Sequence, residues 1–241
     1  MSEIPNSFTL DGQLVPFEPG QTILQAALAA GHYIPHLCSS PELKPHGSCK
    51  LCTVVVNGRH GSACTAHAMP GQDVQSDTPD LNGKRRLQVQ MLFVEGNHFC
   101  PGCEKSGNCK LQAVAYDLEM LNPHFPHFFP QRPVDASHPD ILLDRNRCIM
   151  CEQCVEASRD IDGKEVFGLA GRGLASHLVV NSPSGLLGDS ALEAGDKAAN
   201  ICPVGAIVHK RVGYAKPIGA RDYDTLGIRA QARAAAEGEG P

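Results

Sequence analysis

The run Cys148-Ile149-Met150-Cys151-Glu152-Gln153-Cys154 carries three cysteines, with two residues between each neighbouring pair. Far downstream, Cys202 stands directly before Pro203. Three closely spaced thiolates and a distant Cys-Pro together supply the four ligands of one [4Fe-4S] cubane. The long-range Cys-Pro is typical of a cubane, so zinc is disfavoured here. The two stretches predict a [4Fe-4S] site in a compact module over residues 141–210, with the ligands Cys148, Cys151, Cys154 and Cys202.

The spacing around this site is that of a bacterial ferredoxin with one cluster missing. In a two-cluster ferredoxin, the fourth cysteine of the run ligates the other cluster, but here that position is Ser158. The three mirrored positions before Cys202 hold Leu192, Gly195 and Ala198. We therefore predict a bacterial ferredoxin-like α+β module that keeps one cluster of two.

A second set of four cysteines lies nearer the N-terminus, with ten, two and eleven residues between successive members: Cys38, Cys49, Cys52 and Cys64. A [2Fe-2S] cluster needs four thiolates, which a loop and a neighbouring hairpin can supply at this spacing. The first gap is longer than the four residues of plant-type ferredoxins. Four thiolates also suit a structural zinc ion, which remains the alternative for this set taken alone.

The residues around this set carry hairpin and helix signals. The dipeptides Asp11-Gly12 and Asn57-Gly58 tolerate the positive φ of a type I′ turn, which predicts two hairpins. Between them, Thr22 is the expected cap of a helix that ends at Gly31. Strands are predicted at 7–10, 13–17 and 53–56, with an edge strand at 73–75. This order predicts a β-grasp, plant-type ferredoxin-like [2Fe-2S] domain over residues 1–78.

Between these modules, Cys100, Cys103 and Cys109 provide three thiolates, bracketed by helices predicted from residue 79 to 96 and from 109 to 118. A cubane needs four ligands, and the other eight cysteines belong to their own groups. His98 is the nearest further donor, and histidine can replace cysteine on iron. The alternative is that His98 is an ordinary solvated or packed residue. We predict a small helical His/Cys3 [4Fe-4S] module over residues 79–121.

The remaining segments and the composition limit the function. Residues 122–140 read as a linker, and 211–241 as an extended tail or an arm that orders on a partner. With a net charge of -5, 5% aromatic residues and no Trp, the 241-residue chain has no signature of nucleic-acid binding. No targeting segment or apolar membrane span is recognisable, so a cytoplasmic chain is expected. Eleven cysteines in a reducing compartment point to metal ligands.

The three motifs in this order resemble the N-terminal part of the large iron-sulfur subunit of respiratory NADH dehydrogenase (complex I). A similar order occurs in iron-only hydrogenases. A chain that ends soon after the third module is most similar to the small diaphorase iron-sulfur subunit of soluble NAD-reducing nickel-iron hydrogenases. One difference is that the family places three residues between its histidine and the first cysteine, a position that falls on Gly96. The other is that nothing after residue 210 resembles an iron-only hydrogenase catalytic domain or the long C-terminal region of the complex I subunit.

The resemblance implies an electron-transfer subunit of an oxidoreductase complex. Its expected partners are a flavin- and NAD-binding diaphorase subunit and the small and large hydrogenase subunits, in a hetero-oligomer without nucleic acid or membrane. The chain has no Gly-x-Gly-x-x-Gly and no nickel-site cysteine pairs, so no catalytic residues are expected on it. A complex I-like or NAD-dependent formate dehydrogenase subunit is the near alternative. A zinc-stapled interaction protein without redox function is the distant one.

Overall fold

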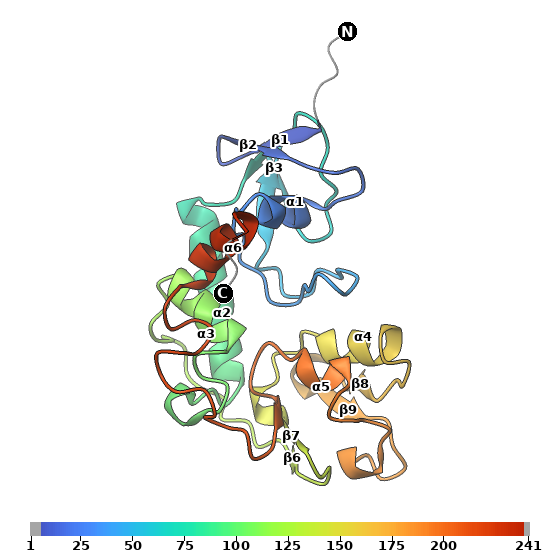
Figure 1. Ribbon diagram of the computed structural model, residues 1–241. Coiled ribbons are helices and arrows are strands. Elements are labelled where there is room, and N and C mark those ends of the chain that lie inside the picture. The colour runs from blue at the N-terminus through green and yellow to red at the C-terminus, as the bar shows by residue number, and fades with distance from the viewer. Residues whose placement is uncertain (1–5, 239–241) are drawn as a thin grey trace. The chain divides into compact units, whose positions relative to one another are not determined.

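The computed structural model describes residues 6–238 and divides the chain into two compact units. Both mix strands and helices, which confirms the predicted α+β class (Figure 1). The first unit comprises residues 1–89, 114–121 and 226–241, and the second comprises 90–113 and 122–225. Among the described residues, no helix is both long and apolar enough to cross a membrane.

The first unit contains a five-stranded mixed sheet in the order β2-β1-β5-β3-β4. The two predicted hairpins are present: Phe8 pairs with Val15, and Val55 pairs with His60. Asp11 and Asn57 have φ values of 50° and 48°, as the two turns require. The five strands are β1 (Ser7–Leu10), β2 (Gln13–Pro16), β3 (Thr53–Val56), β4 (Arg59–Ser62) and β5 (Asp73–Gln75).

The helix α1 (Ile23–Ala29) packs against this sheet (Figure 1). Thr22 caps α1 as predicted, since its hydroxyl accepts from the Gln25 N–H while the Gln25 side chain accepts from the Thr22 N–H. The core of the unit joins the buried side of α1 to inward-facing strand residues such as Phe8 and Val54.

The strand β5 lies inside the sheet, so its prediction as an edge strand was wrong. It pairs in parallel with β1 and antiparallel with β3. Its central residue Val74 is fully buried. Three residues carry too little sequence pattern to show how many strands pair with them. Both pairings of β5 also join residues distant in sequence.

The second unit contains two small antiparallel sheets with helices between them in sequence. One sheet has the order β10-β7-β6, and the other pairs β8 with β9. The strand β6 (Val134–Asp135) lies in the stretch predicted as a linker, where its two residues pair with the start of the module. The other elements are β7 (Ile141–Asp144), α4 (Gln153–Asp160), β8 (Phe167–Ala170), β9 (His177–Val180), α5 (Lys197–Asn200) and β10 (Ile207–His209).

Two helices contribute residues to both units: α2 (Pro79–Glu95) and α3 (Lys110–Asp117). They match the two helices predicted to bracket the second cysteine group. Their ends within the second unit lead directly into the loop that carries Cys100, Cys103 and Cys109.

The C-terminal stretch is not extended throughout, which corrects the predicted tail. Its helix α6 (Ile228–Ala236) contacts α1 within the first unit (Figure 1). Ile228 is buried, and the Arg229 guanidinium pairs with the Asp117 carboxylate at 2.9 Å. The same guanidinium lies 5.8 Å from the centre of the Tyr33 ring. These contacts join residues far apart in sequence, so local composition did not reveal them.

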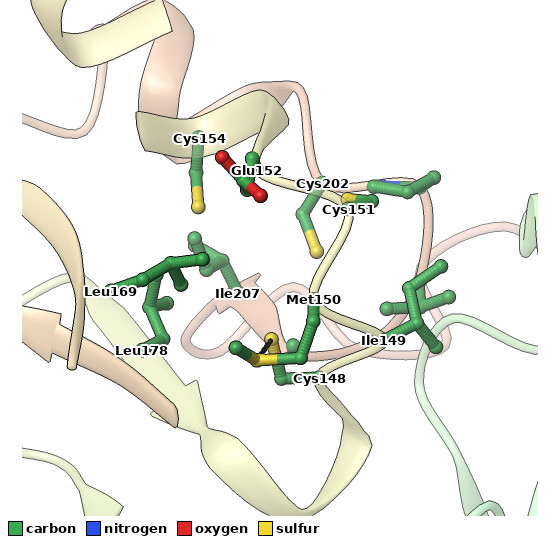
Figure 2. Close-up of a pocket in the computed structure, with 13 residues that line it drawn as sticks. Cys148, Ile149, Met150, Cys151, Glu152, Cys154, Leu169, Leu178, Cys202 and Ile207 are labelled. Atoms are coloured by element: carbon green, nitrogen blue, oxygen red, sulfur yellow. Dashed lines mark hydrogen bonds between the residues drawn. The ribbon is translucent and has the colours of Figure 1, made fainter. Parts of the chain in front are cut away.

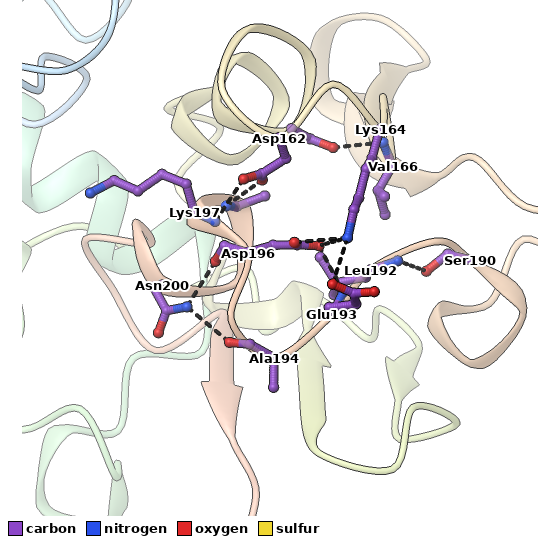
Figure 3. Close-up of polar contacts among 12 residues, drawn as sticks. Asp162, Lys164, Val166, Ser190, Leu192, Glu193, Ala194, Asp196, Lys197 and Asn200 are labelled. Carbon is purple, nitrogen blue, oxygen red and sulfur yellow. Dashed lines mark hydrogen bonds and ion pairs between the residues drawn. The ribbon is translucent and has the colours of Figure 1, made fainter.

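A polar network joins the segment that follows α4 to the segment around the start of α5 (Figure 3). The Lys164 ammonium binds Asp196 at 2.8 Å and Glu193 at 3.1 Å. The Asp162 carboxylate accepts from the first two N–H groups of α5, each at 2.9 Å. Ser158, at the position of the missing cysteine, is fully buried and accepts from the Val166 N–H at 2.7 Å. Ion pairs and hydrogen bonds therefore connect the loop after α4 with the loop before α5.

Candidate metal centres

The first cysteine group converges at one end of the first unit's sheet. Cys52 directly precedes β3 and Cys64 follows β4, so the hairpin brings their sulfur atoms to 3.3 Å. The Cys38 sulfur accepts from the Cys49 N–H at 3.5 Å and contacts the Cys49 and Cys64 side chains. Next to Cys49, Lys50 has a left-handed φ of 55°, which turns the loop toward β3. The structure thus brings all four predicted ligands together.

Arg85 of α2 is a positioning residue for this site that the sequence did not reveal. Only 2% of the residue is exposed. Its guanidinium donates to the carbonyls of Leu51 and Thr53, at 2.9 and 2.8 Å, which are the two residues that flank Cys52. It also donates to the Ser76 carbonyl at 2.7 Å. Arg85 therefore fixes the backbone on both sides of one cysteine. An arginine within a helix gives no local sign that its side chain points inward.

The second cysteine group lines a small cavity in the second unit. Cys100 begins a 3₁₀ turn over Cys100–Gly102, Cys103 directly follows that turn, and Cys109 directly precedes α3. Burial raises the pKa of the Cys109 thiol to about 12, so a bound metal must displace its proton. The other lining residues are Phe93, His98, Phe99, Ser106, Leu111, Gln112, Arg147 and Gly205.

His98 lines the same cavity, and its Nε2 atom is buried without a hydrogen-bond partner. Burial, aided by the charge of Arg147, lowers the pKa of His98 to about 4, so the imidazole is neutral at pH 7. A Cβ placed on Gly96 would come within 2.6 Å of this Nε2. The His98 ring therefore occupies the space beside Gly96, where the related pattern places its histidine. An orphaned neutral imidazole nitrogen beside three thiols fits an iron site that lacks one ligand.

The third cysteine group lines a small cavity (Figure 2). Cys154 extends from α4, whereas Cys148 and Cys151 lie on the loop before it and Cys202 on the loop after α5. Met150 and Glu152 have left-handed φ values of 54° and 61°, so the loop curls between successive cysteines. The rest of the wall is mostly apolar and includes Ile149, Leu169, Leu178, Val204 and Ile207.

In the second and third groups, the cysteines border a cavity. A cubane has four iron corners and takes one protein donor at each, so its donors must surround a space.

Three family profiles match the chain, in the same order as the cysteine groups. They are described as a 2Fe-2S iron-sulfur cluster binding domain over residues 5–79, an NADH-ubiquinone oxidoreductase-G iron-sulfur binding region over 85–124 and a 4Fe-4S single cluster domain over 141–209. They correspond to one [2Fe-2S] cluster and two [4Fe-4S] clusters, the predicted inventory.

Known proteins resemble the chain in whole or in part. The gamma subunit of the NAD-reducing hydrogenase HoxS of Cupriavidus necator is 42% identical over 93% of this chain and 95% of its own length. A chain in the crystal structure of an NAD+-reducing [NiFe]-hydrogenase in the H2-reduced state is 54% identical, with a TM-score of 0.91, over 95% of this chain and 98% of that one. The mitochondrial NADH-ubiquinone oxidoreductase 78 kDa subunit of Neurospora crassa is 32% identical, but the match covers only 30% of its length.

The order of the three cluster motifs and the near full-length match lead to one assignment. This chain belongs to the family of the gamma subunits of NAD-reducing hydrogenases, which are iron-sulfur electron-transfer subunits related to the N-terminal part of the large iron-sulfur subunit of complex I.

Proposed function

We propose that this chain relays electrons, one at a time, between a nickel-iron hydrogenase module and a flavin- and NAD-binding diaphorase subunit in the cytoplasm. The complete complex would convert H2 and NAD+ to NADH and H+. The two electrons released from H2 would pass through the chain, and both bond-changing reactions would take place on partner subunits. The match to the HoxS gamma subunit over nearly its whole length supports this assignment.

We assign the ligands from the side chains that gather at each site. The [2Fe-2S] cluster would be held by Cys38, Cys49, Cys52 and Cys64, in a β-grasp domain over 1–78. One [4Fe-4S] cluster would be held by His98, Cys100, Cys103 and Cys109, in a domain over 79–121. The other would be held by Cys148, Cys151, Cys154 and Cys202, in a ferredoxin-like domain over 141–210.

A backbone hydrogen bond between the second and third sites is the observation that best supports the relay. Lys110, directly after Cys109, donates its backbone N–H to the carbonyl of Pro203 at 2.9 Å. Pro203 directly follows Cys202. One hydrogen bond therefore joins the backbones beside two ligands of different clusters. A protein that used its clusters only as structural staples would not need such proximity.

The relay is tested in the assembled complex by comparing half reactions with the complete reaction. Cys109→Ala should abolish H2-dependent NAD+ reduction. H2 oxidation with an artificial acceptor and NADH oxidation with an artificial acceptor should both persist, since each uses a partner subunit alone. An unimpaired complete reaction in a variant that lacks the second cluster would contradict the relay.

A complex I-like subunit, or the equivalent subunit of an NAD-dependent formate dehydrogenase, is the second candidate. It is favoured by identities of 29% to the alpha subunit of the NADPH-Fe(3+) oxidoreductase of Geobacter sulfurreducens and 32% to the NADH-ubiquinone oxidoreductase 78 kDa subunit. The matches cover only 24% and 30% of those relatives, which weakens the comparison. Identification of the subunits that co-purify with the chain separates the two candidates: hydrogenase subunits support the first, and quinone reductase or formate dehydrogenase subunits support the second.

A further inference from the structure

The guanidinium of Arg147 lies at the junction of the second and third cysteine sites. Arg147 directly precedes Cys148 of the third site, yet its side chain lines the cavity of the second. Its Nη1 atom lies 3.4 Å from the carbonyl of Gly205, on the loop that follows Cys202. Both clusters would therefore have this cation near their ligands.

The junction is tightly packed on the side of Cys103. A Cβ placed on Gly205 would come within 2.9 Å of the Cys103 sulfur and 3.4 Å of the Arg147 Nη1. Glycine at position 205 thus allows a ligand of the second cluster and the guanidinium to approach the loop of the third. The positive charge is held beside a sulfur atom that would bind iron.

Two carboxylates hold the Arg147 side chain in this position. Glu104 binds its Nη1 atom at 2.8 Å, and Asp144 binds its Nε atom at 3.0 Å. Neither carboxylate residue lines the second cavity, whereas Arg147 does. The side chain of Arg147 is 20% exposed, so solvent only partly screens its charge.

We propose that the charge of Arg147 raises the reduction potential of the second cluster. It thereby changes the free energy of electron transfer between the two [4Fe-4S] clusters. This inference rests on the proposed function, because it requires a cluster in the second cavity. Reduction adds one negative charge to a cluster, and a fixed neighbouring cation stabilises the reduced form more than the oxidised form. Arginine keeps its charge at all physiological pH values, so this stabilisation is permanent.

The test is a potentiometric titration of the complete chain, purified anaerobically in its complex and followed by electron paramagnetic resonance. The signal that changes in the His98→Cys protein identifies the second cluster. Arg147→Gln removes the charge and exposes the cluster to the two carboxylates, so its midpoint potential should become more negative. Arg147→Lys retains the charge and should stay close to the wild type. Arg211→Gln is the matched control, since Arg211 pairs with Asp140 at an exposed position in the same unit and should leave the potential unchanged.

An unchanged potential in Arg147→Gln, with both [4Fe-4S] signals present, would overturn the proposal. Equal shifts in Arg147→Gln and Arg147→Lys would also overturn it, because shape and not charge would then be responsible. If Arg147→Gln loses the cluster, Glu104→Gln decides the question. Removal of this anion should make the potential more positive, and no change or the opposite shift would reject the proposal. Absence of the second cluster from the wild-type chain would instead refute the ligand assignment under the proposed function.

Discussion

At the scale of the residue, His98 is the ligand assignment with the most specific consequence. His98→Cys should retain the second cluster, because a thiolate can take the place of the imidazole. The added negative charge should make the midpoint potential of that centre more negative. His98→Ala should yield a labile cluster that loses one iron. Electron paramagnetic resonance and iron analysis measure both effects.

His127→Ala is the matched control, since His127 is exposed, stacks on Phe129 and is not among the residues that line the second and third cysteine cavities. It should leave both readouts unchanged. Full iron content and an unaltered signal in His98→Ala would show that the fourth ligand lies elsewhere, on another histidine of this chain or on a partner subunit.

Arg85 leads to a second prediction, on stability. Arg85→Met should remove the donor that now serves the carbonyls of Leu51, Thr53 and Ser76, two of them in buried bonds. We expect a loss of roughly 2–5 kcal/mol of unfolding free energy, because each unsatisfied buried group costs about 1–3 kcal/mol. Anaerobic denaturation, followed by the visible absorption of the [2Fe-2S] cluster, measures the loss. The neighbouring Arg86, half-buried and bonded to the Leu118 carbonyl at 3.3 Å, provides the control variant Arg86→Met, which should cost much less. Equal losses in the two variants would contradict the positioning function of Arg85.

The residue scale also shows which parts of the sites were readable from the sequence. The cysteines could be recognised as ligands because their spacing along the chain matches a known ligand geometry. Arg85 and Arg147 could not be recognised, because their importance depends on contacts with loops distant in sequence. The fourth ligand of the second cluster could be predicted only in part. The spacing left Gly96 at the position of the family's histidine, and the packing of the His98 ring beside Gly96 supports His98 as the ligand.

At the scale of the element, the network around α5 should substitute for the missing cluster. Lys164→Ala removes the cation shared by Asp196 and Glu193, so the loop before α5 should open more often. Amide hydrogen exchange over residues 192–200 should become faster. Arg159→Ala, which removes an exposed pair with Asp160, is the control and should leave exchange there unchanged. If the two variants exchange alike, the network does not stabilise this element.

The third module should depend on its cluster for order, because metal-binding free energy is also folding free energy. Cys151→Ala should strip one cubane and make residues 141–209 sensitive to protease, while the sheet of the first unit stays resistant. Cys38→Ala is the reciprocal variant, and it should loosen the first site and spare residues 141–209. Unchanged protease resistance of 141–209 in Cys151→Ala would argue against the coupling.

The predictability of the elements followed the range of their contacts. Hairpins with Asp-Gly or Asn-Gly turns and the capped helix α1 were predicted correctly, because local chemistry decides them. The central placement of β5 and the docking of α6 were not, because both depend on partners far away in sequence.

In the molecule as a whole, one chain holds three clusters in sequence order and transfers electrons without substrate chemistry of its own. The three family profiles and the three groups of donors agree on that inventory. Each potential then depends on what surrounds the cluster: the neutral His98 and the cation Arg147 at the second, and an apolar wall at the third.

Metal analysis of the anaerobically purified chain measures this cluster inventory. One [2Fe-2S] and two [4Fe-4S] clusters predict about ten iron atoms and about ten acid-labile sulfides per chain, with negligible zinc. Iron near six per chain would show that one of the predicted cubanes is absent. Stoichiometric zinc in a colourless protein would contradict the relay altogether.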